Sequence, residues 1–375
     1  MIAILKPGRP SNLWKPDGRH FYLLLVMLTI ISLLASCVSP EAAVSVPEGA
    51  PKPKFPTPEA AFTPIPARPP YEPGQLVDYT AQMGDTIPAL AVRFNTKAEE
   101  ILAANSFIPK TTTTMPPGMP MKIPIYFKPL WGTPYQIIPD SLFIDGPADL
   151  NFDLEGYIAA QPGWLGKYHE GMTGGQKSVA EVLRVVADNF SVSPLLMLAI
   201  LNYTTQGLTD PVQPNTTYIL GYVDQFHQGL YMQLVWLANA LNNGYYAYRR
   251  GALTEFETTD GHIERPDPWQ NAATAAIQSV FARLYPYSTY SQMIGPGGLA
   301  ETYAHMFGDP WKDVTPHLPG SLEQPSFILP FEPGRGWNLT GGPHTGWGKG
   351  EPYAAIDFAP NGIVGCAGTN DWVTA

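Results

Sequence analysis

The pattern of apolar and polar positions that begins at Leu76 predicts a strand followed by a helix. Residues 76–82 alternate weakly in polarity, as in a strand with one exposed face. Residues 84–86 read Gly-Asp-Thr, which predicts a turn with polar side chains that can cap the next helix. Within residues 87–94 the apolar side chains recur at i, i+3, i+4 and i+7, which gives that helix a single apolar stripe.

The same segment continues with a second helix and a closing strand. Thr96 and Glu99 have the spacing of a capping box, so we expect the second helix to begin there. A polar loop and a Pro-Gly turn at residues 117–118 precede a short strand at residues 121–125. The pattern therefore predicts a βααβ unit of about 50 residues, close to the smallest size that folds alone.

A larger helical region is predicted downstream. Residues 178–190 carry one apolar stripe, and residues 194–201, which begin with a proline, are apolar on every side and indicate a buried helix. The Tyr-rich residues 245–250 are expected to form a solvated corner at the end of a long helix. Further helices are expected at residues 220–243, 268–281 and 297–306.

The βααβ segment resembles the LysM family. Its opening phrase is Tyr-Thr-Ala-Gln-Met-Gly-Asp-Thr-Ile at residues 79–87, and its middle phrase is Ile-Leu-Ala-Ala-Asn at residues 101–105. Its closing phrase is Pro-Gly-Met-Pro-Met-Lys-Ile-Pro at residues 117–124. The resemblance implies binding of N-acetylglucosamine-containing glycans, usually peptidoglycan, in a shallow groove.

That implied groove lies between the Gly-Asp-Thr-Ile turn and the loop after the second helix. Residues 111–117 lengthen the loop relative to the family pattern and could reshape the groove. The alternative is a small domain that only spaces its neighbours. The glycan-contacting residues implied by the resemblance are Gly84, Asp85, Thr86, Ile87, Asn105, Ile108 and Pro109.

Composition and charge limit the partners. The 375 residues carry a net charge of -10, which argues against nucleic acid as a partner. Hydrophobic residues make up 45% of the chain, which is ample for sizeable cores. Many of the 41 prolines lie in linkers, and residues 38–75 read as a semi-extended Pro-rich tether.

The first 37 residues resemble a bacterial lipoprotein signal peptide. Basic residues precede an apolar run at residues 21–34, which is too short for a comfortable membrane span. The run ends in Leu-Ala-Ser-Cys, which resembles the lipobox and implies that Cys37 is lipidated and anchors the chain to the membrane. The alternative is an uncleaved signal anchor. Either way we expect an extracytoplasmic protein of the bacterial cell envelope, with no internal disulfide, because Cys366 is the other cysteine.

Within the helical region, residues 192–201 resemble a core helix of lysozyme-like lytic transglycosylases. The catalytic Glu-Ser pair of those enzymes aligns here with Thr204 and Thr205, and neither threonine can act as a general acid. We therefore predict a transglycosylase-like scaffold without catalytic residues, or alternatively an unrelated helical spacer. The nearby carboxylates, each expected to be a cap or a solvated residue, are Asp210, Asp224 and Glu255.

The C-terminal segment resembles the beginning of lysostaphin-type (LytM-like) zinc endopeptidases, which cut peptidoglycan peptides. The phrase Ala-Ile-Asp-Phe-Ala-Pro at residues 355–360 matches the family's first motif and implies Asp357 as a zinc ligand. The usual histidine position holds Tyr353, so His344 would have to reach the metal from a longer loop. The alternative is a histidine packed on Trp347 and an aspartate that caps a strand. Strands are expected at residues 327–331, 337–340, 355–358 and 372–375.

The remaining ligand and general base of that family lie in a His-x-His phrase, which does not occur up to Ala375. We therefore expect the peptidase-like domain to be truncated, with no catalytic residue, and expect Zn only if the domain is completed. Two functional classes remain. One is a glycan-binding lipoprotein, and the other is a zinc-dependent peptidoglycan endopeptidase of which this chain is a truncated form.

The sequence thus predicts a multidomain α+β protein that combines a βααβ LysM module, a mostly α-helical middle domain and a partial all-β C-terminal domain. The expected parts are a signal peptide (1–37), a Pro-rich linker (38–75), the LysM module (76–128), the helical domain (129–320) and the start of the peptidase-like domain (321–375).

Overall fold

The computed structural model describes residues 71–312, 314, 328–344 and 355–362. Cys37, residues 38–70 of the predicted Pro-rich linker and the strand expected at residues 372–375 lie outside these described residues. Among the described residues, no helix combines the length and apolar character needed to cross a bilayer.

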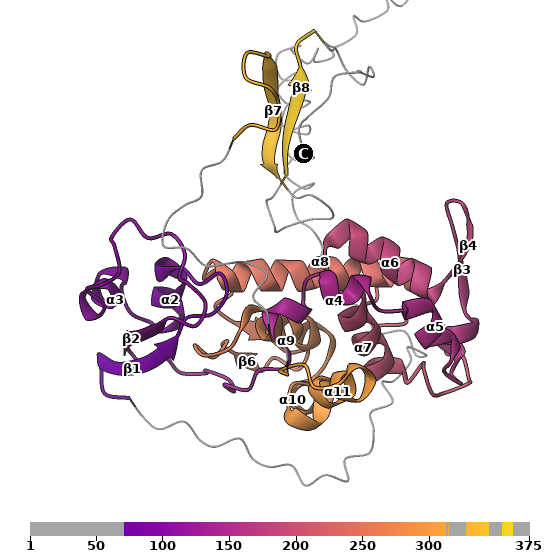
Figure 1. Ribbon diagram of the computed structural model, residues 1–375. Coiled ribbons are helices and arrows are strands. Elements are labelled where there is room, and N and C mark those ends of the chain that lie inside the picture. The colour runs from indigo at the N-terminus through magenta and orange to yellow at the C-terminus, as the bar shows by residue number, and fades with distance from the viewer. Residues whose placement is uncertain (1–70, 313, 315–327, 345–354, 363–375) are drawn as a thin grey trace, which may run out of the picture. The chain divides into compact units, whose positions relative to one another are not determined.

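The predicted βααβ plan is confirmed. Strand β1 (Gln75–Thr80) pairs antiparallel with β2 (Pro120–Ile125), and helices α2 (Ile87–Arg93) and α3 (Ala98–Ala104) complete the unit (Figure 1). Alternate strand residues point inward, because one face of the hairpin is covered. The fully buried centre of this core comprises Leu90, Phe94, Ile101, Met115, Ile123 and Ile125.

The predicted capping box at the start of α3 is wrong. The residue before the helix is Lys97, whose side chain makes no capping bond. Thr96 is used differently, because its backbone N–H closes the end of α2 by donating to Ala91 O, while its hydroxyl donates to Glu100 Oε2 at 2.6 Å. Asn95, with a φ of 55°, ends α2 in the left-handed conformation, and Thr96 is thereby part of the connection and not the cap of α3.

Two helices of the helical part match the prediction closely. Helix α6 (Val179–Phe190) carries a capping box between Ser178 and Glu181, and α7 (Pro194–Thr205) is buried almost throughout. Shorter elements surround them. These are α4 (Pro147–Leu150), α5 (Leu154–Ala159), the 3-10 turns Asp140–Leu142 and Trp164–Lys167, and the hairpins β3 (His169–Met172) with β4 (Gly175–Ser178) and β5 (Phe256–Glu257) with β6 (Ile263–Glu264).

The long helix α8 (Leu230–Arg249) corrects the expected boundaries and the expected solvated corner. It starts later than expected and continues through the Tyr-rich stretch. Tyr245 and Tyr248 are buried because three residues of spacing place both on the same inner face of the helix. The Tyr-rich stretch was expected to leave the helix at a solvated corner. It remains helical because its inner face packs in the core.

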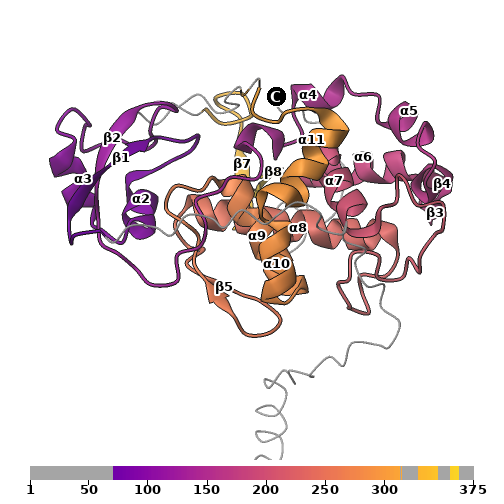
Figure 2. The ribbon, with the colours of Figure 1, turned by 90° about the horizontal axis from the view of Figure 1, so that it is seen from below.

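Three further helices complete this part. Helix α9 (Ala272–Leu284) packs along α8, α10 (Tyr287–Met293) packs against α9, and α11 (Glu301–Phe307) follows a π-type turn at Pro296–Ala300 and packs against α7 (Figure 2). Small residues permit the close approach of α8 and α9. A Cβ at Gly244 would fall 2.9 Å from Ala276 Cα, so only glycine fits there.

The C-terminal hairpin consists of β7 (Trp337–His344) and β8 (Ala355–Pro360), paired antiparallel. The strands expected at 337–340 and 355–358 are confirmed in position. The strand expected at 327–331 is wrong over its described residues, because 328–331 form no strand. Pro330 lacks the N–H that a ladder needs, and Phe331 instead stacks on Trp337 with ring centroids 5.1 Å apart.

Candidate glycan-binding site

The turn between β1 and α2 is built around the buried carboxylate of Asp85. Its Oδ2 accepts hydrogen bonds from the Tyr79 hydroxyl at 2.5 Å and from the Gln82 backbone N–H at 2.7 Å. Its Oδ1 accepts from Arg93 Nη2 at 2.6 Å, and the Asp85 residue is 2% exposed. Every one of these bonds is internal to the domain, so Asp85 holds the shape of the turn.

Some of the neighbouring turn residues stabilise the fold, and others retain exposed surface. Thr86 accepts a bond from the Ala89 N–H and so caps α2, while the Ile87 side chain is buried in the core. Gly84 has a φ of +76°, a conformation that favours glycine, and it is half-buried. Gly84 and Thr86 are therefore the predicted residues of this turn that retain exposed surface.

The second predicted loop is fixed by Asn105. Its side chain donates to Ile101 O and to Lys122 O, both at 2.7 Å, and accepts from the Lys122 N–H at 2.9 Å. Asn105 is 1% exposed. The amide thus joins the end of α3 to β2, which explains why this position needs both a donor and an acceptor.

The loop that follows Asn105 has an inner and an outer side. Ile108 is buried, whereas Pro109 is exposed and Phe107 is 60% exposed. The inserted residues return to the turn, because the Met115 N–H donates to Asp85 O at 2.9 Å. Phe107 was not among the predicted contact residues. An apolar ring in an otherwise polar loop of a binding module could have identified it.

Arg249 of the helical part lies against the LysM turn that contains Gly84. A Cβ built on Gly84 would lie 1.4 Å from Arg249 Nη2, so the end of α8 sits directly against this turn. Arg249 is held there by Tyr245, whose hydroxyl accepts from Nη1 at 3.3 Å. Sequence reasoning missed Arg249 because the contact joins segments that are far apart in the chain.

Trp269 makes a second contact of this kind. Its ring packs edge-on against Phe94 with centroids 4.9 Å apart, and its indole N–H donates to Asp78 O at 3.2 Å. The side chains of Gln82 and Gln136 both donate to the Trp269 carbonyl, at 3.0 and 2.7 Å. Contacts with Trp269, which lies outside the LysM domain, therefore help to hold the turn that contains the candidate site.

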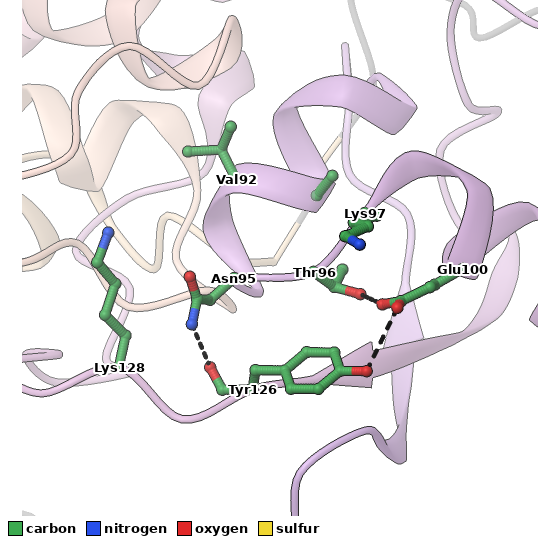
Figure 3. A pocket seen from close by; sticks show the side chains of 8 residues that line it. Val92, Asn95, Thr96, Lys97, Glu100, Tyr126 and Lys128 are labelled. Atoms are coloured by element: carbon green, nitrogen blue, oxygen red, sulfur yellow. Dashed lines mark hydrogen bonds between the residues drawn. The ribbon is translucent and has the colours of Figure 1, made fainter.

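A separate pocket of about 570 Å³ lies between the α2–α3 connection and the segment after β2 (Figure 3). It contains none of the predicted glycan-contacting residues. Its polar groups largely satisfy one another, because Asn95 donates to Tyr126 O at 3.1 Å and Glu100 accepts from both Thr96 and the Tyr126 hydroxyl (Figure 3). The predicted glycan-contacting residues therefore lie outside this pocket, and their assignment stays a prediction.

The predicted zinc ligands lie on the two paired strands of the C-terminal hairpin. His344 is opposite Ala355, and Asp357 is opposite Gly341. A Cβ at Gly341 would fall 2.9 Å from Asp357 Oδ2, so the glycine leaves room beside this carboxylate. Within the described ranges no cluster of three or more His, Cys, Asp or Glu side chains is assembled. The pair remains a prediction, with donor types that suit zinc.

The other polar residues singled out in the sequence have local partners. The hydroxyls of Thr204 and Thr205 donate back to carbonyls one turn earlier, with Thr204 bonded to Ile200 O and Thr205 to Leu201 O. The three carboxylates are also engaged. Asp210 accepts from the Val212 N–H, Asp224 is paired with His227, and Glu255 is paired with Arg265.

Comparisons with known proteins match two parts of the chain. The LysM domain model matches residues 79–124, and the model described as LasA, N-terminal domain, matches residues 136–321. A search of curated proteins and a search of solved structures found no match. The LasA relation falls on the helical part and adds a second link to lysostaphin-type peptidases beside the motif at 355–360.

The two matches indicate the general function of each part. A LysM domain indicates binding of peptidoglycan or related N-acetylglucosamine glycans, and the LasA relation indicates a peptidase-like protein. Residues 79–124 form a LysM domain and residues 136–321 a LasA N-terminal domain, and the chain is thus a LysM protein with a peptidase-like domain of the LytM and lysostaphin type.

Proposed function

We propose that this chain is a lipid-anchored protein of the bacterial cell envelope that binds N-acetylglucosamine-containing peptidoglycan between its two LysM loops. The observation that carries the proposal is the fixed position of these loops. Asp85 and Asn105 hold them from inside, and the Met115 N–H joins them at Asp85 O. Loops that are already held in position bind more tightly because little conformational entropy is lost on binding.

The surface between the loops suits a neutral sugar. Thr86 keeps a partly exposed hydroxyl beside Gly84, which Arg249 contacts, and Phe107 offers an exposed ring on which an apolar sugar face can pack. Acetamido groups need hydrogen bonds more than charge, and backbone N–H and C=O groups supply these. Arg249 adds a single positive charge at the edge of the turn.

The anchoring part of the proposal rests on the sequence. The apolar run followed by Leu-Ala-Ser-Cys supports lipidation at Cys37, and the Pro-rich residues 38–75 support a tether between the membrane and the folded domains. Such a tether lets the LysM domain reach glycan strands away from the bilayer.

Co-sedimentation of the full chain, in mild detergent, with insoluble peptidoglycan tests the proposed function. We expect binding at low and high salt, because the groove contacts are not dominated by charge. Phe107→Ala should weaken binding roughly fivefold, since it removes about 1 kcal/mol of ring contact. Leu76→Ala is the matched control, because Leu76 is an exposed apolar residue of the same domain that lies on β1. Failure of the wild-type chain to sediment with peptidoglycan would refute the assignment.

A zinc-dependent peptidoglycan endopeptidase is the second candidate. The LasA relation and the placement of His344 and Asp357 on paired strands support it. The test is a zymogram with peptidoglycan in the gel and zinc in the buffer. A cleared band that disappears with chelator would favour the endopeptidase, and no clearing would favour the binding function alone.

A further inference from the structure

A groove of about 580 Å³ runs from the LysM turn into the LasA-like domain. The LysM side is lined by residues 78–83 and by Pro117, which lead directly into Gly84 and the candidate glycan site. The opposite side is lined by residues that include Gln136, Asp140 and Trp311. Its volume is in the range of sites that hold small ligands or a few residues of a peptide.

The contact between the two domains forms the floor of this groove. Trp269 lines the groove and packs on Phe94 of the LysM core. Gln82 and Gln136 meet at the same acceptor, the Trp269 carbonyl. The groove therefore exists only because the two domains are in contact.

The lining has acidic charge without basic charge. Asp78 and Asp140 both line the groove, and its described lining residues include no Lys, Arg or His. Asp78 is partly neutralised, because it pairs with Lys122 at the surface. Asp140 is buried, and its Oδ1 accepts from the Ala273 N–H at 2.8 Å. Arg93 and Arg249 act on Asp140 from behind without lining the groove, and the lining itself favours a ligand with an amine over one with a free carboxylate.

The uncharged groups of the groove suit a peptide. Gln82 and Gln136 each donate one of their two amide N–H groups to the Trp269 carbonyl, so a second N–H and the Oε1 of each can bond the C=O and N–H groups of a peptide backbone. Trp269 and Trp311 supply flat apolar faces, and Trp311 is 40% exposed. Aromatic faces and amide groups serve a sugar or a peptide, and the acidic lining is the feature that favours an amine-bearing peptide over a neutral sugar chain.

We propose that this groove binds the amine-bearing peptide branch of peptidoglycan while the adjoining LysM loops hold the glycan to which that branch is attached. This inference rests on the proposed function, because the peptide reaches the groove through the bound glycan. The two domains then recognise one branched ligand together, with sugar at the LysM loops and peptide in the groove.

The test compares three soluble probes on the full chain in mild detergent, by calorimetry or fluorescence. The first is an N-acetylglucosamine tetramer. The second is a peptidoglycan fragment of the same sugar length that carries its stem peptides. The third is that fragment with its free amines acetylated. We expect the second probe to bind about tenfold more tightly than the first, and expect acetylation to remove most of that gain.

Two variants assign the gain to the groove. Trp311→Ala removes an exposed ring, and Asp140→Asn removes the charge while keeping an acceptor for the Ala273 N–H. Each should bring the affinity for the peptide-bearing probe to within about twofold of that for the sugar probe. Phe226→Ala is the matched control, because Phe226 is 70% exposed and does not line the groove, and it should leave the gain intact.

The outcomes separate the two proposals. Equal affinity of the wild-type chain for the sugar and the peptide-bearing probe would overturn the peptide groove and leave the glycan assignment standing. A gain that survives both groove variants would also overturn it. If neither the sugar probe nor the peptide-bearing probe binds, the glycan assignment and the peptide groove fail together.

Discussion

The guanidinium of Arg93 in the LysM domain lies 4.5 Å from the ring centroid of Tyr248 in α8. The same guanidinium donates from Nη2 to Asp85 Oδ1 at 2.6 Å, and both charged side chains are buried. The Asp85 carboxylate raises the pKa of Arg93, and burial together with Asp85 raises the pKa of Tyr79 well above its usual range. One cation thus fixes the turn of one domain and rests on an aromatic ring of the next.

Replacing Arg93 tests this relationship. Arg93→Met should destabilise the folded chain by about 3–5 kcal/mol, because Asp85 would be left buried without its counter-ion. Urea unfolding followed by near-UV circular dichroism measures the change. The control is Lys122→Met, which breaks the exposed pair with Asp78 and should cost less than about 1 kcal/mol. Equal losses in both variants would mean that burial of the Arg93 pair has no energetic weight.

Two glycines of the LysM domain separate backbone strain from the contact with Arg249. Gly84 and Gly118 have φ values of +76° and +84°, but a Cβ at Gly84 meets the Arg249 guanidinium whereas a Cβ at Gly118 meets no atom within 4 Å. Gly118→Ala should therefore cost about 1 kcal/mol, the strain alone. Gly84→Ala should cost more, and Arg249→Ala in the same chain should recover the excess. Thermal unfolding of the wild-type chain, the two glycine variants and the double variant measures these losses of stability. Identical losses for the two glycine variants would contradict the prediction.

The buried carboxyl of Asp140 predicts a pH dependence of stability. Burial raises the pKa of Asp140 to about 6, opposed by the bond from the Ala273 N–H and by the positive charges of Arg249 and Arg93. The unfolded chain releases this proton near pH 3.9. Between the two values the folded state holds more protons, so stability falls as the pH rises from about 4 to about 6 and then becomes constant for this group.

Asp140→Asn should flatten that fall by up to about 1.4 kcal/mol per pH unit within the window. The slope should not vanish, because burial also raises the pKa of Asp149 to about 6. Urea unfolding midpoints between pH 4 and pH 8 measure both curves. Superimposable curves for the wild-type and variant chains would show that Asp140 does not titrate in this range.

Zinc content tests the predicted ligand pair on the C-terminal hairpin. If His344 and Asp357 share a zinc ion, His344→Ala and Asp357→Ala should each lower the bound zinc, because removing either donor weakens the site by tenfold or more. The control is His305→Ala, since the side chain of His305 is 78% exposed on α11. Zinc retained equally by all four proteins, measured by atomic emission after desalting, would exclude this pair as the binding site.

Local patterns in the sequence were sufficient for the LysM fold but not for the role of each residue in it. The apolar spacing that starts at Ile87 and the motif phrases predict α2, α3 and the strand pair. The motifs suggested ligand contact for Asp85 and Asn105, whereas both side chains are buried in hydrogen bonds within the domain. A short polar residue beside a turn can serve either purpose, and the sequence does not show where its partners lie.

The wrong prediction for the end of α8 and the contacts that the sequence did not reveal have a shared cause. The Tyr-rich end of α8 reads as a corner because hydroxyl-bearing rings suit solvent, yet Tyr245 stacks on Phe143 with centroids 4.3 Å apart. Likewise the contacts of Arg249 with Gly84 and of Trp269 with Phe94 join distant segments. Periodicity describes one element at a time, so contacts set by tertiary packing cannot be found from it.

Trp269 gives the LysM core a ring that this domain's own segment does not encode. Domains joined by flexible linkers can be exchanged by recombination at their borders, because few contacts cross the junction. Here a transplanted LysM segment would arrive without the indole that covers Phe94, and a new partner would have to supply an equivalent side chain. We therefore expect the two domains to be inherited together, with substitutions at Phe94 and Trp269 occurring as a pair.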